Sequence, residues 1–132
     1  MYLLDTNICI YLIRKQPPKV LERLMRCSPD EVALSVVTLS ELAFGVSKSQ
    51  SPQKNRTALE LFLTPFQVLA YTAEAAFNYG EIRSELERKG TPIGAMDLMI
   101  AAHAKATGAT LVSNNLKEFR RVSGLETENW AR

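Results

Sequence analysis

The chain has 132 residues, of which 46% are hydrophobic and 23% charged, and its formal net charge at pH 7 is +2. This length predicts one domain, residues 1–132, and the composition is that of a soluble globular protein without a membrane segment. Two cysteines, Cys9 and Cys27, are too few for a disulfide or zinc framework. An apolar strand that begins at the second residue leaves no room for a secretory signal, so we expect a reduced, cytoplasmic protein.

In chain order, the first expected element is a buried strand at residues 1–4, which ends abruptly at Asp5. Residues 7–14 then form a helix, and Pro17 and Pro18 end it and start another. The apolar run 32–34 is the second strand. Thr38 is expected to cap a helix that runs to about residue 46.

Ser51 followed by Pro52 predicts the start of the next helix, and residues 67–70 form the third strand. A long amphipathic helix at 73–89 ends at Gly90, and a nearly all-apolar helix at 95–107 ends at Gly108. A strand at 110–112, a helical turn near 118–121 and an extended piece around 126–129 complete the chain. Because strands alternate with helices throughout, we predict a three-layer α/β/α domain with a mostly parallel central sheet.

Three acids, Asp5, Glu41 and Asp97, lie where an apolar run gives way to a helix or within the first turn of one. In an open α/β sheet, strand ends of this kind converge on one crevice. Carboxylates that converge without basic partners repel one another unless a cation compensates their charge. Because hard oxygen ligands suit Mg²⁺ or Mn²⁺, the pattern predicts a metal site formed by Asp5, Asp97 and Glu41.

Each of these acids also has a simpler interpretation. Asp5 could cap the helix that follows it, and Thr38 with Glu41 matches a capping box. A negative charge in the first turn of a helix, such as Asp97, is stabilised by roughly 0.3–1 kcal/mol without any catalytic role. Together, however, these interpretations require three unrelated caps that all lie at the same edge of the sheet.

The polar segment after the fourth strand could add further groups to such a site. Ser113 and Asn115 could hold a water or a ligand by hydrogen bonds, and Glu118 could be a fourth acid if the turn directs it inward. The simpler interpretation of Glu118 is a solvent-exposed glutamate in a polar turn. His103, the one histidine, is expected to be a structural residue on a buried helix.

Four short motifs occur in order along the chain: LLDTN at residues 3–7, LSELAFG at 39–45, PIGAMDLMIAA at 92–102 and LVSNNLKEF at 111–119. Their order and spacing resemble those of PIN domains, and in particular those of the VapC toxins of bacterial type II toxin–antitoxin pairs. The resemblance covers essentially the entire chain. It implies a PIN-like α/β/α fold.

This resemblance implies a Mg²⁺- or Mn²⁺-dependent endoribonuclease whose catalytic acids are Asp5, Glu41 and Asp97. The fourth acid of the family is commonly an Asp two residues after a Ser or Thr, and here that position is Asn115. An amide is a neutral and weaker ligand, so the departure puts a second tightly bound metal in doubt and makes Glu118 the candidate substitute.

The remaining candidate residues have supporting roles. Thr6 and Ser113 are expected to orient carboxylates or water, and Asn115 and Glu118 to assist on the leaving-group or second-metal side. The basic residues beside that turn are the candidates for contacts with RNA phosphates: Lys117, Arg120 and Arg121.

The resemblance also implies several partners. These are RNA, a second copy of the chain in a homodimer, and a VapB-type antitoxin whose C-terminal tail occupies the groove between the two sites. Through the antitoxin, a larger assembly on DNA is an open alternative. Among RNA substrates, the resemblance favours the anticodon region of initiator tRNA.

Two other classes of protein are alternatives. A haloacid-dehalogenase-like phosphotransferase needs a second Asp where this chain has Asn7, and a receiver domain needs adjacent acids near its first strand. The second class is a PIN-like scaffold with a weakened metal site that acts mainly as an antitoxin- or RNA-binding module. Asn115 is the residue that favours this alternative.

Overall fold

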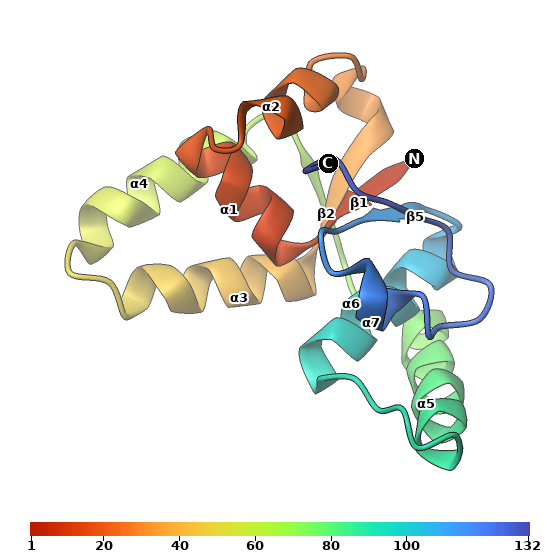
Figure 1. The fold of residues 1–132 in the computed structure, drawn as a ribbon. Coiled ribbons are helices and arrows are strands. Elements are labelled where there is room, and N and C mark those ends of the chain that lie inside the picture. The colour runs from red at the N-terminus through yellow and green to blue at the C-terminus, as the bar shows by residue number, and fades with distance from the viewer.

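A computed structural model describes all residues of the protein, 1–132. Its centre is a five-stranded sheet in the order β3-β2-β1-β4-β5 (Figure 1). The strands are β1 (Tyr2–Leu4), β2 (Val32–Ser35), β3 (Gln67–Leu69), β4 (Thr110–Val112) and β5 (Thr127–Glu128). Every strand pairing is parallel, which confirms the predicted sheet.

Seven α-helices surround this sheet. They are α1 (Thr6–Arg14), α2 (Pro18–Leu24), α3 (Val36–Ser47), α4 (Pro52–Leu63), α5 (Ala73–Arg88), α6 (Ala95–Thr107) and α7 (Leu116–Phe119), and a 3₁₀ turn, Pro29–Glu31, leads into β2. Figure 1 shows α1 to α4 on one side of the molecule and α5 and α6 on the other. None of the helices combines the length and the apolar character needed to span a bilayer.

The two faces of the sheet carry separate apolar cores. Leu3 of β1 packs, with its partners on β2 and β4, in a cluster that includes α5 and α6. The next residue, Leu4, faces the other way and packs, again with its partners, against α1, α2, α3 and α4. Since successive side chains of a strand point to opposite faces, short apolar strands buried on both sides produce the predicted three layers.

Helix α3 starts earlier than predicted. Its N-cap is Ser35, whose Oγ accepts a hydrogen bond from the backbone N–H of Val37 at 3.0 Å. The prediction that Thr38 caps this helix is therefore wrong. The hydroxyl of Thr38 donates instead to the carbonyl of Leu4, at 3.5 Å, and ties α3 to the end of β1. Without a Thr38 cap there is no capping box for Glu41 to complete.

Helix α7 is likewise shifted towards the N-terminus, from the predicted 118–121 to Leu116–Phe119. The chain turns immediately after β4 because Ser113 Oγ accepts from the backbone N–H of Asn115 at 2.9 Å. Phe119, which is 1% exposed, then anchors the end of the helix in the core. Glu118 is therefore the third residue of α7.

Helix α6 ends at Gly108, whose φ of 67° lies in the left-handed region, and a Cβ there would meet no atom within 4 Å. Gly108→Ala should therefore lower the free energy of unfolding by about 1 kcal/mol through backbone strain alone. Gly80→Ala, inside α5 and equally uncrowded, should raise it by roughly 0.5–1 kcal/mol. Urea unfolding measures both, and effects of the same sign would contradict this account.

Candidate active site

Three neighbouring strands deliver polar residues to one edge of the sheet. Strand β1 is in parallel register with β2 and with β4, so Asp5, Ser35 and Ser113 are brought together where these strands end. The backbone N–H of Asp5 continues the ladder by donating to the carbonyl of Val112 at 3.0 Å. This is the carboxyl edge of the strands, where open α/β sheets bind ligands.

Asp5 is 5% exposed and caps α1, because its Oδ1 accepts from the backbone N–H of Ile8 at 3.0 Å. Burial raises the pKa of the Asp5 carboxyl to about 6. Hydrogen bonding from Ser113 and from Ile8 partly offsets this rise in pKa, and the charge of Glu41 adds to it. The cap accounts for one hydrogen bond to Oδ1, so it does not exclude a role for this carboxylate in a site.

Glu41 lies in the second turn of α3, and its Oε1 accepts a hydrogen bond from the hydroxyl of Thr6 at 2.5 Å. Thr6 is the first residue of α1, next to Asp5. This contact joins two helices that follow different strands. The predicted orienting role of Thr6 stays a prediction, and its hydroxyl contacts one of the candidate carboxylates.

Asp97 is in the first turn of α6 and half-buried, and its pKa is raised to about 6. Burial is the largest cause, followed by repulsion from three other acids, Glu118, Glu41 and Asp5, and by a hydrogen bond with Glu118. All four acids are therefore near enough for their charges to interact. They come from four separate segments of the chain.

Asn115 and Glu118 act together in the structure. The amide of Asn115 donates from Nδ2 to Oε2 of Glu118 at 3.0 Å, and Glu118 is partly buried rather than fully exposed. Asn115 thus orients another acid through its amide. Sequence reasoning proposed each residue separately but missed this bond, whose only signal is the i, i+3 spacing of the pair.

The predicted RNA-binding residues differ in their surroundings. Lys117 and Arg120 are exposed, whereas the guanidinium of Arg121 donates to the carbonyl of Pro92 at 3.0 Å and fixes the segment ahead of α6. None of the ion pairs in the molecule involves any of the four acids. Their negative charge is thus not compensated by Lys or Arg.

No group of three or more Asp, Glu, His or Cys side chains is arranged in the structure so that it could hold a metal ion. The donor chemistry nevertheless fits a hard divalent cation, because the converging groups are carboxylates, and burial followed by mutual repulsion raises the pKa of Asp5 and Asp97. A divalent cation would compensate this repulsion.

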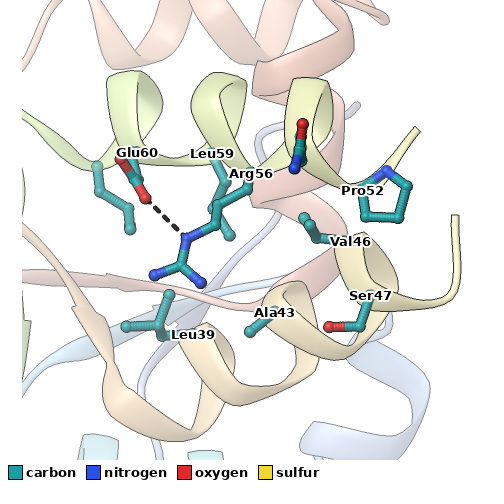
Figure 2. A pocket seen from close by; sticks show the side chains of 10 residues that line it. Leu39, Ala43, Val46, Ser47, Pro52, Arg56, Leu59 and Glu60 are labelled. Atoms are coloured by element: carbon teal, nitrogen blue, oxygen red, sulfur yellow. Dashed lines mark hydrogen bonds and ion pairs between the residues drawn. The ribbon is translucent and has the colours of Figure 1, made fainter.

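A separate hollow of about 430 Å³ lies between α3 and α4 (Figure 2). Its lining is largely apolar, from Leu39 and Val46 on α3 and Leu59 on α4, and an ion pair between Arg56 and Glu60 borders it. None of the four acids lines this hollow. It is therefore distinct from the candidate active site.

Comparison with known proteins bears on this arrangement of acids. The family model described as PIN domain matches residues 2–125. A ribonuclease VapC2 of Rickettsia felis is 46% identical over 131 residues, and a tRNA(fMet)-specific endonuclease VapC of Shigella flexneri is 46% identical over 130, each alignment covering 98% of both chains. The chain belongs to the VapC family of PIN-domain proteins.

Solved structures of VapC proteins share the fold described above. The crystal structure of VapBC2 from Rickettsia felis, bound to a DNA fragment from the promoter, matches with a TM-score of 0.92 and 45% identity over 98% of each chain. The DNA-bound VapBC of Salmonella typhimurium matches with a TM-score of 0.92 and 43% identity, over 98% of this chain and 97% of that one. The predicted PIN-like fold is confirmed.

The raised pKa of Asp5 has a consequence for stability. A carboxyl whose pKa is about 6 when folded and near 3.8 otherwise binds more protons in the folded state, so the free energy of unfolding falls as pH rises from about 4 to 6. Asp5→Asn keeps the cap and removes the charge. At about pH 8 we expect the free energy of unfolding of Asp5→Asn, measured by urea denaturation, to exceed that of the wild type by on the order of 2–3 kcal/mol. Near pH 4 this difference should disappear.

Asp30→Asn, which removes an exposed acid from the 3₁₀ turn, is the matched control and should show no such pH-dependent gain. Equal stability of Asp5→Asn and the wild type at both pH values would contradict the account of Asp5.

Proposed function

We propose that this protein is the toxin of a type II toxin–antitoxin pair and hydrolyses RNA phosphodiester bonds as a Mg²⁺- or Mn²⁺-dependent endoribonuclease. The observation that carries the proposal is the set of four carboxylates, from distant segments, whose charges act on one another at the carboxyl edge of the sheet. Two further facts support it: the chain belongs to the PIN-domain family, and its relatives are named as ribonucleases or endonucleases.

In the proposed mechanism, Asp5 and Asp97 hold the cation, and Glu41 completes its surroundings or orients the attacking water. A bound divalent cation lowers the pKa of a coordinated water and screens charge on the phosphate oxygens. Thr6 fixes the carboxylate of Glu41 through its hydroxyl, and Ser113 lies against Asp5. These contacts limit the movement of the two carboxylates that they touch.

Glu118 is the proposed fourth acid, held by Asn115 on the side of Asp97. Since Asn115 itself brings no charge, the site carries its fourth carboxylate one helical turn later than the common family pattern. With a carboxylate supplied there, the proposal favours an active enzyme over a scaffold with a weakened site.

The substrate is proposed from the relatives. The VapC proteins of Shigella flexneri and Salmonella typhimurium, 46% and 43% identical to this chain, are named tRNA(fMet)-specific endonucleases. We propose initiator tRNA, in its anticodon region, as the target. Lys117 and Arg120 are exposed on and beside α7, so they are available for backbone phosphates next to the acids.

We further propose that a VapB-type antitoxin neutralises the protein in the cytoplasm, as a partner in an assembly that binds DNA through the antitoxin. The support comes from structural relatives that are VapBC complexes, two of them bound to DNA. The homodimer with two sites across a groove remains a prediction from the family.

Asp97→Asn should lower the rate of cleavage of initiator tRNA by more than about 100-fold, because it removes a carboxylate from the proposed cation site. The matched control is Glu74→Gln, since Glu74 is likewise an acid in the first turn of a helix, but exposed on α5. End-labelled tRNA with Mg²⁺ is the assay. Cleavage retained by Asp97→Asn would refute the assignment.

A calorimetric titration with Mn²⁺ tests the site without RNA. The wild type and Glu74→Gln should bind the ion, and Asp97→Asn should not. Because protons compete with the ion for carboxylates of pKa about 6, the affinity should fall as pH falls through that value. Binding of RNA but not of Mn²⁺ by the wild type would favour the alternative, a non-catalytic binding module.

A further inference from the structure

His103 is a buried ionisable group that the proposed hydrolysis does not use. It lies on α6, the helix that carries Asp97, and its side chain is 0% exposed. Its Nδ1 is 2.7 Å from the hydroxyl oxygen of Ser35, and its ring packs edge-on against Tyr71 with 5.5 Å between the centroids. The hydrogen bond to Ser35 is the one that the imidazole makes with another side chain.

The contact with Ser35 is a hydrogen bond in either tautomer of the ring. Ser35 Oγ accepts from the backbone N–H of Val37 at 3.0 Å and keeps its own proton and a second lone pair, so it can donate to Nδ1 of His103 or accept from an Nδ1–H. The other ring nitrogen, Nε2, makes no hydrogen bond in the structure, although the carbonyl of Ala70 acts to raise the pKa of the ring. Burial has the larger effect and lowers this pKa, so the ring is neutral at physiological pH.

This hydrogen bond joins the two helices that carry Glu41 and Asp97. Ser35 caps α3, and Glu41 follows it along that helix, while Asp97 precedes His103 by an equal number of residues on α6. At 1.5 Å per residue, each acid is about 9 Å along a helix from the bond. A helix transmits a displacement of one end to the other, so a shift between Ser35 and His103 changes the separation of the two acids.

We propose that His103 is a positioning residue, whose imidazole holds Ser35 at the start of α3 through the Nδ1–Oγ hydrogen bond and so sets the distance between Glu41 and Asp97. The catalytic part of this inference rests on the proposed function. The structural part does not, because it concerns the arrangement of α3 and α6 in the metal-free protein.

A histidine that merely fills the core would behave differently. Replacing such a histidine by an apolar residue of similar size would change the free energy of unfolding but leave the position of α3 unchanged. A positioning histidine predicts instead that loss of the bond from either side, at His103 or at Ser35, has the same effect on the acids. It also predicts that losing both partners is no worse than losing one.

The test compares His103→Leu, Ser35→Ala and the double variant with two controls. Ser35→Thr keeps a hydroxyl, and Ile100→Val makes a small cavity at a 0% exposed position of the same helix. Mn²⁺ affinity and the kcat for tRNA cleavage are measured at a temperature where every variant is folded. We expect His103→Leu and Ser35→Ala each to lose about tenfold in both quantities, without additivity, and both controls to stay near the wild type.

Two measurements need neither metal nor RNA, so they decide this inference even if the protein cleaves nothing. Long-range ¹H–¹⁵N spectra of the wild type and Ser35→Ala should differ at Nδ1 of His103, because that nitrogen loses its hydrogen bond in the variant. In His103→Leu, backbone amide shifts should change along α3 as far as Glu41, whereas in Ile100→Val they should not. An unchanged Nδ1 signal in Ser35→Ala, shift changes confined to α6, or additive losses in the double variant would overturn the proposal.

Discussion

The burial of mutually repelling carboxylates at one edge of the sheet is the constraint on which the rest of the structure depends. Burial and neighbouring charge raise the pKa of Asp5 and of Asp97 to about 6, so at neutral pH the fold keeps both ionised at a cost in stability. No Lys or Arg forms an ion pair with them. The cost must be exceeded by the apolar cores on the two faces of the sheet.

Two side-chain hydrogen bonds then restrain the acids. The hydroxyl of Thr6 restrains Glu41, and the amide of Asn115 restrains Glu118, each by a single hydrogen bond to a carboxylate oxygen. Neither contact neutralises charge, so both order the acids without relieving their repulsion. A site built in this way has a strong electrostatic preference for a cation, which is the property that metal-dependent hydrolysis of RNA requires.

The sheet and the positions of Asp5 and Asp97 could be predicted because buried parallel strands are short apolar runs and their ends share an edge. The cap of α3 could not, since Ser35 and Thr38 are both good caps, and only the contact of Thr38 with Leu4 across the fold separates them. The environment of Glu118 was equally hidden, because it depends on where α7 begins.

Strand β1 lies at the middle of the sheet, and its register partners on β4 are more than a hundred residues away, as Tyr2 and Thr110 illustrate. Until β4 has been synthesised, β1 lacks one of its two neighbours, and Glu118, the last of the four acids, follows β4 in the chain. Closing such long loops also slows folding. The pocket therefore cannot form before residues 110–118 have been made, however early the first strand and its acid leave the ribosome.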